Sequence, residues 1–380
     1  MWKEQIEACL QGIRPADQQA MKAAAARQEK LAKPPGSLGQ LENIAIRLAG
    51  ITGSVVTMPQ KPAVLIFSAD NGVAAEGVSS APQSVTMAQT INFTRKLTGV
   101  GALAGNFDVE LLICDVGIAG TVPAELSVAE TEALFQTETA KILDRKIARG
   151  TANLARGPAM RREQALKAMA AGLELARAAA AHGFDLLGVG EMGIGNTTTS
   201  TAVLAALLDL DPAEITGRGG GLTDAALEKK RQVIKDALHR LHREQPQADV
   251  TDILARLGGF DLAAMCGAFL GAAENRVPVV IDGYISAVAA LCACRLQPQC
   301  RDALFASHRS VEPGAQRVIE ALRLRPLLDL DLRLGEGSGC VLAFQIIRGA
   351  GAVMRDMATF EEAAIDDSYL EEIRAGGGRI

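Results

Sequence analysis

The apolar residues of this chain gather in short runs that are separated by longer stretches with helical character. Each run is continuous rather than alternating, which is typical of strands buried on both faces of a parallel sheet. The predicted strands are Ala63–Asp70, Val109–Gly117, Phe184–Glu191, Pro278–Gly283 and Ala303–His308. Helices are expected at Arg161–Ala181, at Thr197–Leu208 after a possible Asn196 cap, and at Thr223–Glu244 after a threonine cap. The alternation predicts an α/β fold, a parallel doubly wound (Rossmann-like) sheet flanked by helices.

Composition narrows the class of protein. The chain is 48% hydrophobic and 22% charged, with 38 glycines and 3% aromatics, which suits a tightly packed α/β enzyme with ligand-facing loops. The net charge is −5 without a block of like charge, so we expect no nucleic-acid partner. The polar N-terminus lacks the apolar core of a secretory signal, and stretches such as Gly283–Cys294 are shorter than the ~20 residues of a membrane span. We therefore expect a cytoplasmic protein without a membrane partner.

The cysteines and histidines do not predict a metal site. The chain has 7 cysteines, and their odd number argues against a disulfide framework. Cys292, Cys294 and Cys300 have a spacing that could suggest metal ligands, but the first two lie in an apolar run without a nearby histidine. His239 and His242 lie on a charged helix and lack a third ligand, which favours a solvated face. We expect no metal and no cofactor.

Polar side chains follow the predicted strands. They are Asp70, Asp115, Glu191, Asp282 and the segment Ser307–Ser310. Ligands of open α/β sheets bind outside the carboxyl ends of the strands, so we expect these residues to converge on one rim.

The stretch "GVGEMGIGNTTT" carries glycines at 188, 190 and 193, the spacing of a dinucleotide-binding turn. That motif also needs an acidic residue about 20 positions on, at a strand end. Asp209 has the right distance but follows a predicted helix, and an anionic Glu191 would repel a pyrophosphate. The helix start at 195–197 suits a single phosphate instead, although an ordinary capped helix explains it equally well.

Four other side chains are candidates. Lys230 lies about two turns into a helix that follows a glycine-rich segment, where a solvated charge is the simpler interpretation. Glu336 lies between glycines in "LGEGSG" and could act as a general base if shielded from water, or serve as a turn acid beside a helix. Ser80 and Gln89 follow the first strand, in either a binding loop or a surface loop.

Seven motifs in this order make a more specific pattern: "KPPGSLGQLE", "SADNGVAAEGVS", "GVGEMGIGNTTT", "LGGFDLAAMCGAFLGAA", "PVVIDGYISAVAAL", "SHRSVEPGA" and "RLGEGSG". Over residues 30–355 the chain resembles the nicotinate-nucleotide–dimethylbenzimidazole phosphoribosyltransferase family. The resemblance implies transfer of the phosphoribosyl group of nicotinate mononucleotide to 5,6-dimethylbenzimidazole, with inversion. Nicotinate and α-ribazole 5′-phosphate are the products, in cobalamin nucleotide-loop assembly.

The resemblance also implies roles for residues. Glu336 falls at the catalytic base and Glu191 at a second active-site acid. Phosphate and ribose would be held by Gly193, Asn196, Thr197, Lys230, Ser310 and Asp282. The base would be bound by Ser80, Gln89, Leu334 and Gly335. The leaving pyridinium needs no metal. Ala81 stands where a serine is expected, so the accepted base stays open between benzimidazoles, adenine and phenolic compounds.

We expect a large α/β catalytic domain over 56–340 and a small helical domain built from 1–55 plus 341–380. The resemblance implies a homodimer. The tail "AGGGRI" is expected to be disordered. Two other functions stay open at this point, a nicotinamide-dependent oxidoreductase and a non-catalytic nucleotide-binding protein.

Overall fold

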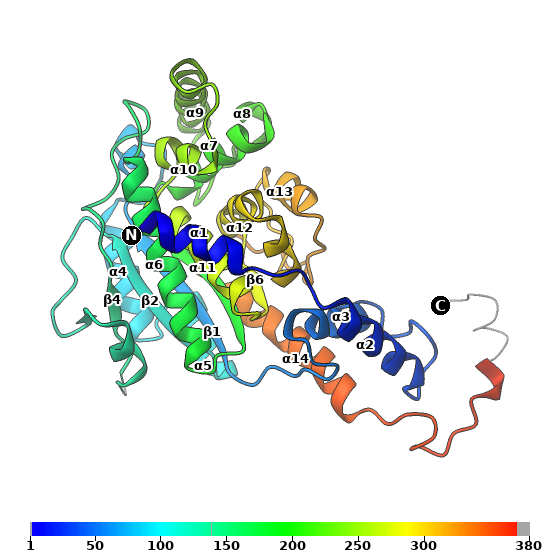
Figure 1. Cartoon of the computed structure of the whole chain (residues 1–380). Coiled ribbons are helices and arrows are strands. Elements are labelled where there is room, and N and C mark those ends of the chain that lie inside the picture. Colours follow the sequence, from blue (N-terminus) through cyan, green and yellow to red (C-terminus); the bar gives the residue numbers. More distant parts are fainter. Residues whose placement is uncertain (1, 138, 371–380) are drawn as a thin grey trace.

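The computed structural model describes residues 2–137 and 139–370 (Figure 1). The predicted disorder of the tail and the last ten residues of the predicted small domain lie outside these residues. The core of the described fold is a seven-stranded sheet in the order β3-β4-β2-β1-β5-β6-β7, and each pair of neighbouring strands is parallel. The predicted α/β fold with a parallel, helix-flanked sheet is confirmed.

The strands are β1 (Pro62–Ala69), β2 (Glu110–Gly117), β3 (Ser127–Val128), β4 (Ile142–Asp144), β5 (Leu186–Met192), β6 (Val279–Ile281) and β7 (Leu304–Ala306). The α-helices are α1 (Trp2–Gly12), α2 (Gln18–Lys30), α3 (Gln40–Thr52), α4 (Ser84–Thr94), α5 (Gly99–Phe107), α6 (Arg162–Ala181), α7 (Asn196–Leu208), α8 (Pro212–Ile215), α9 (Asp224–Glu244), α10 (Val250–Leu257), α11 (Phe260–Glu274), α12 (Tyr284–Leu296), α13 (Ala315–Leu322) and α14 (Ser338–Asp356). Short 3₁₀ helices are η1 (Gly72–Glu76), η2 (Thr131–Phe135), η3 (Pro298–Ala303) and η4 (Ser368–Leu370).

The central strand β1 explains why the apolar runs are continuous. All of its residues are buried, and successive side chains point to opposite faces of the sheet. Leu65 and Phe67 join the core formed with α6, α11 and α12, whereas Val64 and Ile66 join the core formed with α3, α5 and α14. A strand covered by helices on both faces needs apolar residues at every position.

Two glycines let α6 and α11 pack closely on the first of these faces. A Cβ at Gly172 of α6 would collide with the backbone of Ala264, and a Cβ at Gly267 of α11 would collide with that of Met169. All the residues of α11 from Phe260 to Ala273 are buried. The absence of two side chains therefore allows a nearly all-apolar helix to lie directly on its neighbour.

The chain ends supply helices to two different places. α1 packs against α6 and α11 on the sheet body, while α2 and α3 pack with α14 in an arm that extends from it (Figure 1). The division at residues 55 and 341 stays a prediction. The position of α1 places residues 2–12 with the large body.

The predicted start of α9 is confirmed, whereas the predicted start of α7 is wrong and two short strands were not predicted. The two short strands β3 and β4 were not predicted, because they do not lie in continuous apolar runs such as those that contain β6 and β7. Thr223 caps α9 as expected, accepting a hydrogen bond from the N–H of Ala226 at 3.3 Å. The predicted Asn196 cap is wrong. Gly195, at φ 92°, is the cap residue of α7, and Asn196 is the first helical residue.

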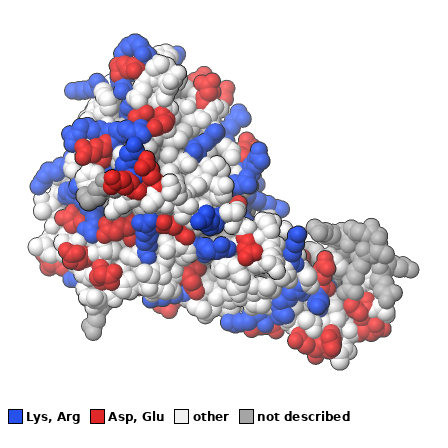
Figure 2. Space-filling model, in the orientation of Figure 1, with Lys and Arg blue, Asp and Glu red and all other residues white. Residues whose placement is uncertain are grey.

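On the face seen in Figure 2, Lys and Arg side chains alternate with Asp and Glu side chains. Within residues 2–137 and 139–370, no helix has the length and apolarity needed to span a bilayer.

Candidate active site

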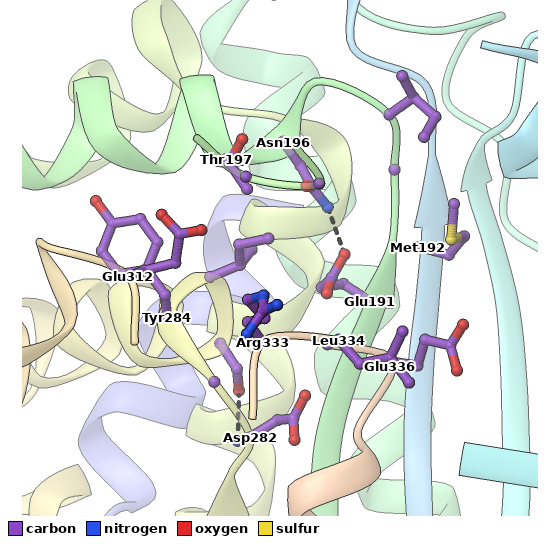
Figure 3. Close-up of a pocket in the computed structure, with 18 of the residues that line it drawn as sticks. Glu191, Met192, Asn196, Thr197, Asp282, Tyr284, Glu312, Arg333, Leu334 and Glu336 are labelled. Atoms are coloured by element: carbon purple, nitrogen blue, oxygen red, sulfur yellow. Dashed lines mark hydrogen bonds between the residues drawn. The ribbon is translucent and has the colours of Figure 1, made fainter. Parts of the chain in front are cut away.

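A cavity of about 310 Å³ opens at the carboxyl edge of the sheet, beyond β5, β6 and β7 (Figure 3). The predicted site residues that line it are Ser80, Gln89, Glu191, Gly193, Asn196, Thr197, Asp282, Ser310, Leu334, Gly335 and Glu336. Lys230 lies immediately behind the lining and donates a hydrogen bond to Thr197 Oγ1 at 2.8 Å. The fold thus brings the predicted residues together from segments that are up to 256 positions apart in the chain.

The expected convergence of all strand-end residues is only partly correct. Asp70 and Asp115 lie outside the lining of this cavity. Asp70 Oδ2 accepts the N–H of Ala119 at 2.7 Å, and Asp115 accepts that of Ile118 at 2.8 Å. Asp115 also pairs with Lys146 at 3.2 Å. These two carboxylates secure the loops beyond β1 and β2 instead of facing the cavity.

Glu336 lies on a loop with an unusual backbone. Gly335, Glu336 and Gly337 have φ values of 85°, 64° and 91°, so three successive residues are left-handed. A left-handed conformation is costly for a residue with a side chain and persists only where the surroundings hold it. The glycines on either side adopt it at little cost, which explains the pattern "GEG".

Asp282, at the end of β6, is the group that holds this loop. Its Oδ2 accepts the N–H of Gly337 at 2.9 Å, and its Oδ1 accepts that of Gly339 at 2.7 Å. These amides belong to the N-terminus of α14, where a carboxylate is favoured by the helix dipole. Burial raises the pKa of Asp282 to about 7, against the lowering effect of these bonds. Its assigned role at phosphate or ribose stays a prediction, whereas its contact with the Glu336 loop was not foreseen.

The Glu336 side chain is 5% exposed and reaches the opposite wall. Its Oε1 accepts from Gln89 Nε2 at 3.0 Å, and its Oε2 accepts the N–H of Val100, in the first turn of α5, at 3.3 Å. Burial raises the pKa of Glu336 above its usual value, and the bonds from Val100 and Gln89 oppose that rise. The result is a fixed, shielded carboxyl group that is a stronger base than a solvated glutamate.

Glu191 differs from the anion assumed from the sequence. It lies at the end of β5 and is 7% exposed. Burial raises its pKa to about 8, and the neighbouring carboxyls of Asp261 and Asp282 add to the effect. Asn196 Nδ2 donates to Glu191 Oε2 (Figure 3). At neutral pH Glu191 is therefore mostly a neutral carboxylic acid, and the argument that it repels a phosphate fails.

The glycine pattern is better explained by the strand that contains it. Gly188 and Gly190 lie inside β5, not in a turn. A Cβ at Gly190 would come within 2.5 Å of the carbonyl oxygen of Glu336, and one at Gly188 within 2.6 Å of Cys340 Cβ. The two glycines let the start of α14 approach the strand, so the spacing that resembles a dinucleotide motif serves to seat the Glu336 loop.

Lys230, Thr197 and the N-terminus of α7 form a second part of the site. Lys230 is 1% exposed, so the alternative of a solvated surface charge is excluded. Its Nζ donates to Thr197 Oγ1 and to the carbonyl of Gly217 at 3.1 Å. Burial lowers the pKa of Lys230 to about 8, and the nearby Glu312 carboxyl opposes that change. A cation beside free helix N–H groups suits a phosphate.

Sequence reasoning missed several side chains of the site. Glu312 and Arg333 line the cavity, and Asp261 contacts Asn196 from outside it. Asp261 was inside the quoted motif "LGGFDLAAMCGAFLGAA" but was not singled out. The available signal was an acidic residue at the start of an otherwise apolar helix, since such a residue is buried only when it has partners.

Within the part of the chain that the structure describes, no group of three or more His, Cys, Asp or Glu side chains is arranged to hold a metal ion. All seven cysteines are free thiols.

Taken together, the fold and the cavity define a doubly wound α/β protein with a small-molecule site at the carboxyl edge of its parallel sheet. A family model described as "Phosphoribosyltransferase" matches residues 13–365, and the chain belongs to that family.

Curated relatives agree over nearly the whole length. The chain is 47% identical over 367 residues to the nicotinate-nucleotide–dimethylbenzimidazole phosphoribosyltransferase of Clostridium perfringens (strain ATCC 13124), with 96% of each chain covered. It is 44% identical to the protein of that name from Clostridium tetani, covering 97% of this chain and 98% of the other. The crystal structure of CobT from Thermus thermophilus has a TM-score of 0.85 at 43% identity, and covers 92% of this chain and 100% of its own.

Proposed function

We propose that this chain transfers the phosphoribosyl group of nicotinate mononucleotide to 5,6-dimethylbenzimidazole or a related lower-ligand base. The products are nicotinate and α-ribazole 5′-phosphate, as expected for cobalamin nucleotide-loop assembly. The relatives that support this proposal carry the name of that activity. The observation that carries it in this chain is the fixed, buried carboxyl of Glu336 at one wall of the cavity.

In the proposed reaction Glu336 accepts the proton from one nitrogen of the base. The other nitrogen then attacks the anomeric carbon of the ribose from the face opposite the nicotinate. The bond from that carbon to the pyridinium nitrogen breaks, and its electron pair neutralises the ring. A cationic ring is already a good leaving group, so positioning and one general base account for most of the acceleration.

The remaining side chains divide between the two substrates. We assign the phosphate and ribose to Lys230, Thr197, Asn196, Gly193, Asp282 and Ser310, supported by the buried Lys230 ammonium next to the start of α7. We assign the base to Ser80, Gln89, Leu334 and Gly335, which line the cavity around Glu336. Glu191, as a neutral acid, offers an O–H hydrogen bond to the donor nucleotide rather than a negative charge.

The direct test is incubation of the purified chain with nicotinate mononucleotide and dimethylbenzimidazole, followed by chromatography. We expect equal amounts of nicotinate and a ribazole phosphate. Parallel reactions with adenine and a phenol, each in competition with dimethylbenzimidazole, would rank the acceptors. The absence of product with every acceptor would refute the proposal. Turnover of a nicotinamide dinucleotide with a hydride acceptor would instead support the oxidoreductase alternative.

We further propose that the protein acts in the cytoplasm as a homodimer. The exposed Leu334, 58% accessible at the cavity, and Leu97, 69% accessible at the turn before α5, support a partner surface near the mouth of the site.

A further inference from the structure

Behind the cavity lies a chain of buried polar side chains that the proposed reaction does not yet use. Asp261, the second residue of α11, is 0% exposed. Its Oδ2 accepts from Asn196 Nδ2 at 3.2 Å and from Asn71 Nδ2 at 3.5 Å, and its Oδ1 accepts the N–H of Leu262 at 2.9 Å. The same Asn196 nitrogen donates to Glu191 Oε2. One amide group thus joins a carboxyl that faces the cavity to a carboxyl that does not.

The surrounding backbone is shaped to admit this second carboxyl. A Cβ at Gly193 would come within 2.6 Å of Asp261 Oδ2, and a Cβ at Gly259 would collide with Asp261 Oδ1. Two glycines from different loops therefore leave room for one aspartate. Burying a carboxylate costs free energy, so a buried aspartate that the surrounding backbone is shaped to admit indicates a role beyond packing.

In addition to the larger effect of burial, the Asp261 carboxylate raises the pKa of Glu191. Burial raises the pKa of Asp261 to about 6, with the bonds from Leu262, Asn196 and Asn71 opposing the rise. At neutral pH Asp261 is then mostly ionised while Glu191 keeps its proton, because two carboxyls that interact closely do not both ionise readily. The other titratable or charged groups that line the cavity are Asp282, Tyr284, His308, Glu312, Arg333 and Glu336.

We propose that Asp261 is a positioning residue for the transfer reaction: it holds the amide of Asn196 and thereby orients the carboxyl of Glu191. Separately from that hydrogen bond, the nearby Asp261 carboxylate disfavours ionisation of Glu191. It does not touch the substrates. This inference rests on the proposed function, because it concerns how the neutral Glu191 is maintained for the donor nucleotide. The proposal also explains why Asn196, the first residue of α7, does not cap the helix, because the Asn196 side chain connects Glu191 and Asp261.

The test combines Asp261→Asn with Glu191→Gln in a double-mutant cycle. The single Asp261→Asn change removes the charge and one of the two acceptor oxygens, so an NH₂ group faces either the Asn196 and Asn71 amides or the N–H of Leu262. We expect kcat to fall about tenfold or more with KM for nicotinate mononucleotide within about twofold. The alkaline limb of the kcat profile should move down by about one pH unit or more, because the charge that raises the Glu191 pKa is gone.

In the Glu191→Gln background the same Asp261→Asn change should cost less than about twofold, because a residue that acts through Glu191 has no effect once Glu191 is replaced. Asp115→Asn, which also removes a buried carboxylate but lies in β2 outside the cavity lining, is the matched control and should leave the alkaline limb in place. Equal losses in both backgrounds, or an unmoved limb in Asp261→Asn, would overturn the proposal.

Asn71→Ser gives a second route if Asp261→Asn does not fold. It removes one donor to Asp261 from outside the cavity lining. We expect a smaller loss of kcat than with Asp261→Asn, and none in the Glu191→Gln background; a loss of the same size in both backgrounds counts against the proposal. If the unmodified enzyme makes no ribazole phosphate, the proposed function fails instead, so the two failures are distinguishable.

Discussion

At the scale of single residues, the site depends on side chains whose ionisation is set by burial. Glu336, Glu191 and Lys230 are each less than one tenth exposed. Burial raises the pKa of the two glutamates and lowers the pKa of the lysine, so each shift favours the uncharged form. Displacements of this kind are concentrated at functional sites because they match proton affinity to a reaction near neutral pH. The three residues give separate predictions for catalysis, stability and binding.

Replacing the proposed base should separate catalysis from binding. We expect Glu336→Gln to lower kcat by about 10²- to 10⁴-fold, the usual contribution of a general base, with KM for nicotinate mononucleotide changed by less than about threefold. The wild-type rate should fall as the pH drops through the raised Glu336 pKa, since only the ionised group accepts a proton. Steady-state kinetics measure both effects. Glu320→Gln, an exposed change on α13, is the control, and full activity of Glu336→Gln would remove Glu336 from this role.

The raised pKa of Glu191 predicts a pH-dependent stability. In the unfolded chain the group ionises near its ordinary 4.5, whereas in the folded chain it holds its proton until about pH 8. The unfolded state therefore binds fewer protons between these values, and Glu191 lowers the free energy of unfolding as the pH rises, by at most about 1.4 kcal/mol per unit.

Glu191→Gln cannot lose a proton, so the variant should be more stable than wild type at pH 8 and nearly equal to it at pH 5. Urea unfolding of both proteins at the two pH values measures the difference. A stability difference that does not change with pH would contradict the protonated state of Glu191.

Lys230 should contribute mainly to binding of the donor nucleotide. A charge-assisted hydrogen bond to a phosphate contributes about 1.5–3 kcal/mol, so Lys230→Met should raise KM for nicotinate mononucleotide by about 10- to 100-fold. The adjacent Lys229, whose side chain is 55% exposed, provides a matched control. Lys229→Met should stay within about twofold of wild type. Equal effects of the two changes in KM would argue against a phosphate at Lys230.

At the scale of elements, the catalytic loop depends on how closely α14 approaches β5. Gly190→Ala tests this contact, because its Cβ would come within 2.5 Å of the Glu336 carbonyl oxygen and the loop would have to move. We expect a large loss of kcat, tenfold or more, since displacement of about 1 Å at a reacting group is costly.

Gly349→Ala, in the body of α14, is the control, because a Cβ there would meet nothing within 4 Å. It should keep full activity and add about 0.5–1 kcal/mol of stability, because alanine favours the helical state. Kinetics and thermal unfolding of both variants measure these effects. Unimpaired turnover of Gly190→Ala would show that the position of the loop tolerates this displacement.

Elements also differ in how far the sequence predicts them. The central strands β1, β2 and β5 were located because their mainly apolar runs reflect burial on both faces. The edge strand β3 and its neighbour β4 were missed because neither lies in a continuous apolar run of the kind that marks β6 and β7. The cap of α7 was misassigned because Asn196 is a favoured cap residue by type, yet its amide donates to Glu191, five positions before it, and to Asp261, 65 positions after it.

At the scale of the whole molecule, the arm of α2, α3 and α14 extends from the sheet body (Figure 1). α14 belongs to both, because its N-terminus carries the Glu336 loop and its body packs on α3.

The proposed dimer gives the prediction at this scale. We expect light scattering at micromolar concentration to give about twice the chain mass of 39.8 kDa. Leu97→Glu, which puts a charge on the most exposed leucine near the site, should shift the distribution toward monomer and reduce activity in parallel. A fully active monomer, or a dimer unaffected by this change, would contradict a partner surface at that position.

The sequence by itself determined the parallel α/β architecture, because burial on both faces of a sheet requires continuous apolar runs that can be read directly. It also determined the identity of most residues around the cavity, since these occur in ordered motifs. Only the tertiary structure decided the protonation and the position of those residues. The protonation of Glu191 depends on its burial and on Asp261, which lies 70 positions away, and the position of Glu336 depends on Asp282, 54 positions before it. Proton affinity and loop geometry follow from distances and burial in three dimensions, and neither is encoded in the spacing of residues along the chain.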